Sequence, residues 1–333
     1  MKRVFIVTGA AGFLGNTVVK ELLNRGEKVR ALCVSGHEPK SLKDTKAKIY
    51  FGDITKKETL KDIFSKAEDE ELVVIHCAAV VYIKNKKNPR VDQVNVNGTM
   101  NIVEKCLETS ARMIYVNSVH SIPEPKDDRV IKEIDNFNPD DVVGIYAKSK
   151  ALGAKLVREA IKDKGLNCTI VQPSGIMGPG DYGMTHLSRM FLVIAQGKLP
   201  AIVKGGYDFV DVRDVANGII SAVDNGKVGE SYLLSNRYIS IRDIADSISK
   251  VSGSKRVKTV LPLFIAKIGA PFMEAYYGIR KQVPLFTSYS LHTLNSKCNF
   301  THEKATKDLG YTTRSLDDTV KDTLEFFREI KQL

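Results

Sequence analysis

Short apolar runs alternate with longer amphipathic stretches from the N-terminus to Pro173. In the first amphipathic stretch, Leu14, Val18 and Leu22 recur every four residues and predict one apolar helix face, which Gly26 ends. Strands that alternate with helices are typical of a parallel sheet. The pattern therefore predicts an α/β fold, with buried strands at residues 4–8, 28–33, 48–52, 72–77, 113–117 and 168–172.

The parallel pattern loosens after Pro173. A glycine-rich crossing and a predicted helix near residues 186–197 come first, and residues 210–223 and 231–234 then return to the first domain. From Ser240 onward, short helical segments and proline-punctuated loops indicate a smaller lobe. We expect a doubly wound sheet domain of residues 1–175 and about 206–236, and a lobe of about 176–205 and 237–333.

The composition is that of a folded protein. Of the 333 residues, 43% are hydrophobic and 27% are charged, which supplies a sizeable core and excludes a disordered chain. No apolar run reaches the roughly 20 residues that cross a bilayer. The best candidate, residues 261–273, is interrupted by prolines and a lysine, so we interpret it as a wall of the smaller lobe, with an interfacial helix as the alternative. The apolar stretch at residues 4–7 is too short for a signal peptide, so we expect a cytoplasmic protein with no integral membrane segment.

Charge and cysteine content narrow the partners. Lys and Arg together number 50 against 39 for Asp and Glu, and the net charge of +11 favours anionic ligands such as phosphates. The lysines are spread along the chain without a block of five, so we expect no nucleic-acid partner. The cysteines are five in number and widely spaced, which predicts free thiols in a reducing compartment and no metal site.

A glycine-rich turn follows the first predicted strand directly. Residues 8–15 read TGAAGFLG and open the first helix. Gly9, Gly12 and Gly15 permit a tight turn, a close backbone approach to a pyrophosphate and close helix packing, while the helix N-terminus favours negative charge. In this strand-turn-helix context the motif predicts dinucleotide binding.

The G-x-x-G-x-x-G spacing resembles that of the extended short-chain dehydrogenase/reductases. Further family motifs follow in family order over nearly the whole chain: GDIT from Gly52, HCAA from His76, NVNGT from Asn95, QPSGIMGPG from Gln172, FVDVRDVA from Phe209 and DLGY from Asp308. The resemblance implies a Rossmann-type doubly wound parallel sheet with a smaller, mostly C-terminal substrate-binding lobe. It also implies a dinucleotide held by Gly9, Gly12, Phe13, Leu14, Gly15, Asp53, Ile54, Cys77, Ala78, Ala79, Tyr146, Lys150, Pro173, Gly175 and Ile176.

The end of the second strand bears on the choice between NAD and NADP. An Asp or Glu there would bind the adenosine ribose and favour NAD, whereas a basic residue would pair with the additional phosphate of NADP. The acid expected near Cys33 is absent, and so is the Arg that NADP-using relatives often carry near Val34. We expect NADP, with Ser35 and His37 as phosphate contacts, and NAD stays open as the alternative.

The family's catalytic pair is Tyr-x-x-x-Lys, which Tyr146 and Lys150 match. Two other pairs in the chain share this spacing, but only Tyr146 follows the fifth strand and begins a long predicted helix, residues 146–162. Residues four apart share a helix face, so we expect the ammonium to stabilise the phenolate and lower the tyrosine pKa toward neutrality. The resemblance implies that Ser118 hydrogen-bonds the substrate carbonyl and that Asn95 supports a proton relay.

Two positions bear on the substrate. Val119 and His120 stand where nucleotide-sugar dehydratases carry an Asp-Glu pair, and Tyr207 stands where epimerases place an Arg for the substrate diphosphate. The whole pattern is more similar to the dihydroflavonol-4-reductase and 3β-hydroxysteroid-dehydrogenase branch, whose members act on largely apolar ketones, aldehydes or alcohols. The loops expected to line the substrate site carry Tyr82, His120, Met177, Tyr182, Met184 and Tyr207.

The resemblance therefore implies an NAD(P)-dependent carbonyl reductase or alcohol dehydrogenase. A nucleotide-sugar 4-epimerase that uses the same Tyr146 is the first alternative, and a non-catalytic, cofactor-binding regulatory protein is the second. Family resemblance also implies a homodimer through the helices near residues 97–107 and 149–162.

Overall fold

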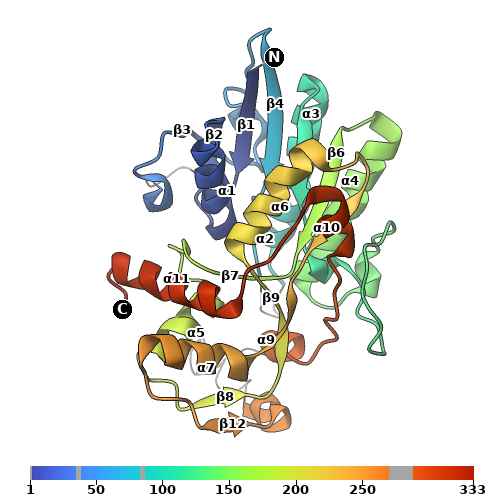
Figure 1. The fold of residues 1–333 in the computed structure, drawn as a ribbon. Helices are drawn as coiled ribbons and strands as arrows, with labels where there is room; N and C mark the ends of the chain where they lie inside the picture. The colour runs from blue at the N-terminus through green and yellow to red at the C-terminus, as the bar shows by residue number, and fades with distance from the viewer. Residues whose placement is uncertain (1, 35–38, 83–86, 270–287) are drawn as a thin grey trace.

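The computed structural model describes residues 2–34, 39–82, 87–269 and 288–333. Its centre is a sheet of seven parallel strands in the order β10-β6-β5-β4-β1-β2-β3 (Figure 1). The predicted doubly wound α/β fold and its six predicted strands are confirmed, and β10 is the seventh strand. The strands are β1 (Lys2–Thr8), β2 (Lys28–Cys33), β3 (Lys48–Phe51), β4 (Glu70–His76), β5 (Arg112–Val116), β6 (Cys168–Pro173) and β10 (Ser231–Leu234).

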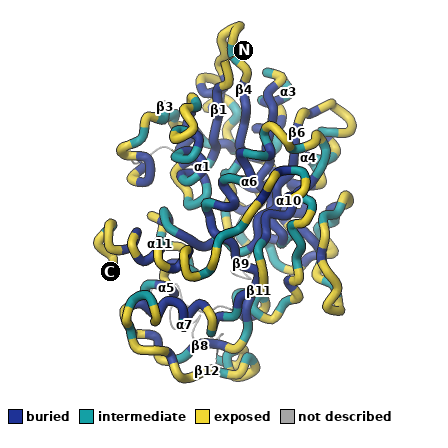
Figure 2. Tube along the Cα trace, viewed as in Figure 1, coloured by how far each residue is buried: buried dark blue, intermediate teal, exposed yellow. Residues whose placement is uncertain are grey.

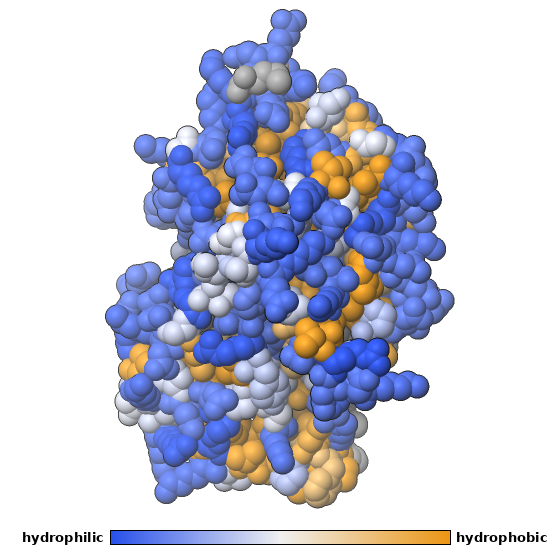
Figure 3. All heavy atoms as spheres, turned by 45° about the vertical axis from the view of Figure 1, so that its right-hand side comes forward, coloured by the Kyte–Doolittle hydropathy of each residue, from blue (hydrophilic) through white to orange (hydrophobic). Residues whose placement is uncertain are grey.

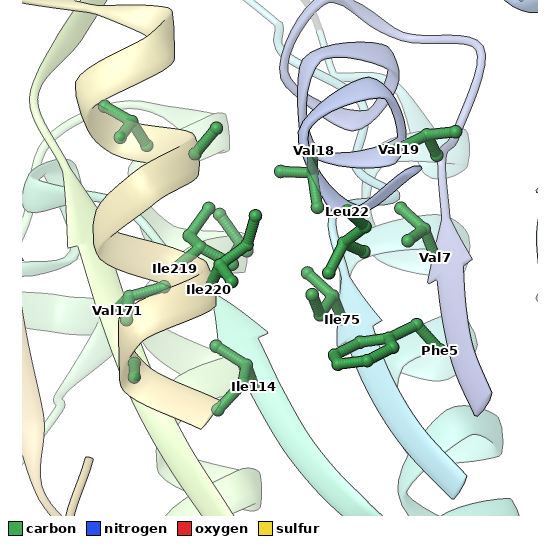
Figure 4. Packing of buried hydrophobic residues seen from close by; sticks show 14 of the residues in the cluster. Phe5, Val7, Val18, Val19, Leu22, Ile75, Ile114, Val171, Ile219 and Ile220 are labelled. Carbon is green, nitrogen blue, oxygen red and sulfur yellow. The ribbon is translucent and has the colours of Figure 1, made fainter. Parts of the chain in front are cut away.

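Alternation along each strand sends its side chains to two separate cores. In β1, Phe5 and Val7 face one core, whereas Val4 and Ile6 face the other. The first core lies beneath α1 (Phe13–Asn24) and α6 (Val212–Asn225), which pack side by side, as Figure 4 shows. The second lies beneath α3 (Thr99–Thr109) and α4 (Ile145–Lys164).

The order of the strands places a crevice at the edge of the sheet formed by the carboxyl ends of its strands. β1 pairs with β2 on one side and with β4 on the other, so the chain leaves β1 in one direction and returns on its opposite side. At such a switch point the loops after neighbouring strands diverge, and ligands of α/β proteins bind there. The strands and the inner helix faces are buried (Figure 2), which makes this edge a rigid base for the loops.

A second, smaller lobe lies beyond this edge. It contains a three-stranded sheet, a two-stranded sheet and helices that share one apolar core. Its elements are β7 (Gly175–Met177), α5 (His186–Ala195), β8 (Ala201–Val203), β9 (Gly206–Asp211), β11 (Arg237–Ser240), α7 (Ile241–Ser252), β12 (Thr259–Leu261) and α11 (Leu316–Glu329).

Short helical segments lie in the connections between the strands and helices of both the sheet domain and the lobe. They are η1 (Lys40–Leu42), η2 (Lys57–Leu60), α2 (Pro89–Asp92), the π-helix η3 (Gln93–Gly98), η4 (Val119–Ser121), η5 (Pro139–Asp141), α9 (Ser288–Thr293) and α10 (Glu303–Leu309). The five cysteines are free thiols, as predicted.

The apolar stretch that begins at Leu261 lies at the far end of this lobe. Within it, residues 263–269 are helical, and Phe264, Ile265 and Ile268 are exposed. Figure 3 shows hydrophobic surface gathered at this end of the molecule. Residues 270–273 of the stretch lie outside the described residues. Across the described part of the chain, no helix combines the length and apolarity needed to cross a membrane.

Candidate active site

A cleft of about 800 Å³ opens at the switch point, between the sheet and the smaller lobe. It brings together every predicted cofactor-binding residue within the described ranges: Gly9, Gly12, Phe13, Leu14, Gly15, Asp53, Ile54, Cys77, Ala78, Ala79, Tyr146, Lys150, Pro173, Gly175 and Ile176. Ser35 and His37, the predicted phosphate contacts, lie outside the described residues.

The glycine-rich loop between β1 and α1 has no room for side chains. Gly9 has a φ of +66°, and a Cβ atom there would lie 2.8 Å from the Ala78 backbone. At Gly15 a Cβ atom would lie 2.1 Å from the Gly9 carbonyl oxygen. The Gly12 N–H donates to that oxygen at 2.9 Å, and α1 begins immediately afterwards. This bare cradle at the positive end of a helix dipole fits a pyrophosphate.

Asn16 ties the glycine-rich loop to the loop that follows β7. Its buried side-chain amide donates to the carbonyls of Gly12 at 2.7 Å and Gly180 at 3.0 Å. Sequence reasoning missed this residue, because an Asn within a helix pattern carries no signal of a partner far along the chain. The loop after β7 is thereby held against the start of α1.

One end of the cleft combines apolar surface with a carboxylate, which suits an adenosine group. Leu32, Val34 and Ile54 supply apolar surface there. Asp53 accepts hydrogen bonds from the backbone and hydroxyl of Thr55 at 2.9 and 2.8 Å, and the backbone bond holds the Asp53 pKa below its usual value. Arg90 also lines the cleft and lowers this pKa further. Arg90 could not be predicted from the sequence, because it sits on the short helix α2, which no periodic pattern marks.

Ser118, Tyr146 and Lys150 meet in the middle of the cleft. Tyr146 begins α4 directly after Gly144, whose φ of +103° turns the chain into the helix. The Ser118 and Tyr146 side chains form a hydrogen bond. One helical turn later, the Lys150 ammonium donates to the Val116 carbonyl at 2.7 Å. All three side chains are buried, so the cleft shields them from bulk water.

The pKa values of this group differ from the sequence-based expectation. Burial raises the pKa of Tyr146 to about 12, and the hydrogen bond with Ser118 only partly offsets this. Burial also lowers the pKa of Lys150 to about 7. The expected fall of the tyrosine pKa toward neutrality is therefore not seen: desolvation dominates, and the Lys150 ammonium is directed at the Val116 carbonyl.

Asn95 lies beside this group without lining the cleft. It is buried in the π-helix η3, where its amide exchanges hydrogen bonds with the Val80 backbone at 2.7 and 3.0 Å. The same amide donates to the Ser149 hydroxyl at 3.0 Å, and that hydroxyl donates to the Tyr146 carbonyl at 2.7 Å. These contacts connect the loop after β4 to the start of α4, so they give Asn95 a positioning role.

Of the six predicted substrate residues, His120 lies beside Tyr146, and Tyr207 lies beside His120. The His120 ring packs edge-on against Tyr146 with a centroid distance of 6.0 Å and stacks on Tyr207 at 5.6 Å. Both line a smaller cavity of about 120 Å³, and His120 also lines the main cleft. The other four, Tyr82, Met177, Tyr182 and Met184, line neither cavity.

The positions of three of these four have clear causes. Met177 is buried in the core of the smaller lobe, and Met184 packs against that core. Tyr182 packs edge-on against Phe326 at 5.1 Å, with the Lys20 ammonium 5.1 Å from its ring. These side chains satisfy the packing of the lobe, which a motif alone does not distinguish from a ligand contact.

Residues 5–235 match the model of the NAD dependent epimerase/dehydratase family, well over half of the chain. The chain belongs to this family. Sterol demethylase protein B of Methylococcus capsulatus is 28% identical over 329 residues, which cover 97% of this chain and 98% of the relative. A Synechocystis protein with a provisional dihydroflavonol 4-reductase name is 27% identical, with coverage of 98% and 95%. The crystal structure of gox2253 superposes with a TM-score of 0.84 at 30% identity over 99% of both chains.

Other matching relatives are named 3β-hydroxysteroid dehydrogenases. The resemblance to extended short-chain dehydrogenase/reductases, and to this branch of them, is thus confirmed. The epimerase/dehydratase family member described here is an enzyme, an NAD(P)-dependent oxidoreductase that acts on CH–OH or carbonyl groups.

Proposed function

We propose that this enzyme is a carbonyl reductase or alcohol dehydrogenase for a small, largely apolar ketone, aldehyde or alcohol. The observation that carries the proposal is the meeting of Ser118, Tyr146 and Lys150 in a cleft whose wall is otherwise mostly apolar. A cleft of that kind binds apolar ligands and directs a few polar groups at one reacting atom.

The cofactor residues of the proposal are those of the cleft. Loop 9–15 would hold the pyrophosphate, Asp53 and Ile54 the adenine, and Pro173, Gly175 and Ile176 the nicotinamide end. We propose NADP as the preferred cofactor, because β2 ends at Cys33 without the carboxylate that would select the ribose of NAD. Arg90 adds a cation near Asp53 at the same end of the cleft.

The geometry supports the following chemistry. When bound, the nicotinamide supplies or accepts a hydride. Ser118 donates a hydrogen bond to the substrate oxygen, and the Tyr146 hydroxyl donates the proton that completes the alcohol, or accepts it in the reverse direction. A pKa of about 12 keeps Tyr146 protonated at neutral pH, which suits reduction. The Lys150 ammonium, held by the Val116 carbonyl, favours the phenolate left after proton transfer.

Two positions support an apolar substrate over a sugar nucleotide. Val119 and His120 supply no acid-base carboxylate pair after Ser118. Tyr207 is buried against His120, so this position offers an aromatic ring where a diphosphate would need a guanidinium.

The organisation of the chain is part of the same proposal. We propose that residues 1–175 and about 206–236 form the cofactor domain and that the remaining residues form the substrate lobe. Two elements depart from these ranges: residues 206–211 form β9 in the small sheet of the lobe, and α10 packs Ala305 and Leu309 into the core beneath α1 and α6.

The proposal is tested by the oxidation of NADPH and NADH with a panel of aliphatic, aromatic and steroid-like carbonyls, with UDP-sugars assayed in parallel. We expect turnover of apolar carbonyls and a preference for NADPH. Conversion of a UDP-sugar without turnover of any carbonyl would instead support a nucleotide-sugar 4-epimerase that uses the same Tyr146. No conversion of either class would support a regulatory protein.

A further inference from the structure

The cavity of about 120 Å³ shares one wall with the catalytic cleft. That wall is the His120 side chain, which packs on Tyr146 on one side and on Tyr207 on the other. If the carbonyl of a substrate lies at Tyr146, the part of its chain that extends past the His120 imidazole would therefore enter this cavity. Burial lowers the pKa of His120 to about 4, so the wall is uncharged at neutral pH.

The cavity has an apolar floor and a polar rim. Ile122, Ile131 and Phe300 form part of the floor. The rim carries Glu124 from the segment after β5 and His292 from α9, two segments that are far apart in the sequence. A chain of carbon atoms fits this floor, and a polar terminal group fits the rim.

Glu124 is the acceptor that this rim offers. Glu124 is exposed as a whole residue, but partial burial of its carboxyl raises the Glu124 pKa, while nearby His292 and a hydrogen bond with Ser296 lower it. Among the described residues of the lining, Lys297 carries a positive charge, and it forms an ion pair with Asp128. Asp141 adds a second carboxylate to the lining. An anionic group would meet both carboxylates, whereas a hydroxyl could donate a hydrogen bond to Glu124.

We propose that this cavity is a second substrate subsite, which takes the non-reacting end of the carbonyl substrate as a short apolar chain that ends in a hydroxyl group bound by Glu124. The inference rests on the proposed function and names the substrate class more closely. At about 15 Å³ for each water-sized group, the cavity has room for roughly eight such groups. That limit fits an acyclic chain or a single ring and excludes a steroid body from this subsite.

The test compares octan-2-one with 8-hydroxyoctan-2-one as substrates of the full-length enzyme with NADPH and NADH. We expect kcat/KM to be about tenfold higher for the hydroxy ketone, the usual effect of one hydrogen bond to a charged acceptor. The carboxylate analogue, 8-oxononanoate, should be poorer than octan-2-one because Glu124 and Asp141 repel it.

Variants at Glu124 separate the subsite from the chemistry. Glu124→Leu should bring the ratio of the two kcat/KM values to about one. Glu124→Gln keeps an acceptor oxygen and should therefore retain most of the preference for the hydroxy ketone. Asp163→Leu, an exposed carboxylate near the end of α4, is the matched control and should leave the ratio unchanged.

Each of the alternative outcomes would contradict a specific part of the proposal. Equal kcat/KM for the two ketones in the parent enzyme, or a ratio that Glu124→Leu leaves intact, would overturn the subsite alone. A preference for 8-oxononanoate would overturn the hydroxyl assignment. Turnover of none of these ketones with either cofactor would overturn the proposed function and the subsite with it.

Discussion

Lys150 lies one helical turn beyond Tyr146, yet its ammonium donates to the Val116 carbonyl and its pKa falls to about 7 through burial. Tyr146 shifts in the opposite direction for the same reason. At the scale of single residues, desolvation therefore decides the protonation states of the reacting groups. The charge of Lys150 becomes the part of the site that titrates near neutral pH.

This assignment predicts the pH dependence of carbonyl reduction. Lys150 is an ammonium below its pKa of about 7 and loses the proton above it, so kcat/KM should fall as the pH rises through that value. Lys150→Arg keeps its charge, so its activity, although lower, should not fall between pH 7 and 9. Profiles of kcat/KM from pH 5 to 9.5 measure this. An equal decline in Lys150→Arg would assign the titration to another group; His120, with a pKa of about 4, is already neutral in this range.

The glycine-rich loop leads to a second prediction at this scale. Gly12 has a φ of −74°, and a Cβ atom there would lie 3.1 Å from the Gly9 carbonyl oxygen, so a small shift of the loop lets Gly12→Val fold. Its side chain would then occupy the cradle of loop 9–15. The Kd for NADPH, measured by fluorescence titration, should rise at least about tenfold, the equivalent of 1.4 kcal/mol. Gly269→Val is the control, because no atom of the described residues lies within 4 Å of a Cβ atom there. Equal NADPH affinity in Gly12→Val and the parent would contradict the cradle.

At the scale of elements, the strands and helices of the sheet domain could be predicted because their apolar periodicity matches their burial. Most of the residues that line the cleft could likewise be predicted, from the glycine-rich turn and the Tyr146–Lys150 spacing. Hydrogen bonds between elements could not be predicted. Asn16 and Arg112, for example, are polar residues within apolar patterns, and their partners are brought near only by the fold. Met177 failed as a substrate contact for the opposite reason, because packing in the lobe core claims its side chain.

Arg112 shows what such a link contributes. From β5 its guanidinium donates to Asn167 and Thr169, each at 2.7 Å, and to the carbonyls of Ala222 at 3.2 Å and Gly226 at 2.6 Å. It therefore joins the sheet to the end of α6.

We expect Arg112→Met to lower the free energy of unfolding by about 3 kcal/mol, because it leaves buried acceptors without donors. Urea denaturation measures this change. Arg25→Met removes exposed contacts with Glu21 and Asn217 and should change the same quantity by less than about 0.5 kcal/mol. Similar values for both variants would show that the Arg112 contacts do not hold the two elements together.

In the molecule as a whole, the cleft that contains Ser118, Tyr146 and Lys150 lies where the sheet domain meets the smaller lobe. The fold class and the order of its parts followed from the sequence. The details of the substrate cavity did not, because its walls come from the segment after β5, from β9 and from the chain after α9.

The predicted homodimer also belongs to this scale. The predicted contact uses α3 and α4, so the outer faces of these helices would be covered in the assembly. Sedimentation equilibrium should give a mass near twice that of the 36.9 kDa chain, falling toward one chain on dilution. A mass of one chain at every concentration would rule out the dimer.

Deuterium transfer from the cofactor to the substrate tests whether Tyr146 completes the reduction of a substrate carbonyl. The enzyme is supplied with NADPH or NADH deuterated at C4 of the nicotinamide and with carbonyls that the panel identifies, and the alcohol is analysed by mass spectrometry. We predict one deuterium on the carbinol carbon and oxidation of one cofactor per alcohol. Tyr146→Phe should lower the rate by about 10²–10⁴-fold with cofactor affinity nearly unchanged. Equal rates in Tyr146→Phe and the parent, or alcohol without deuterium, would contradict the account.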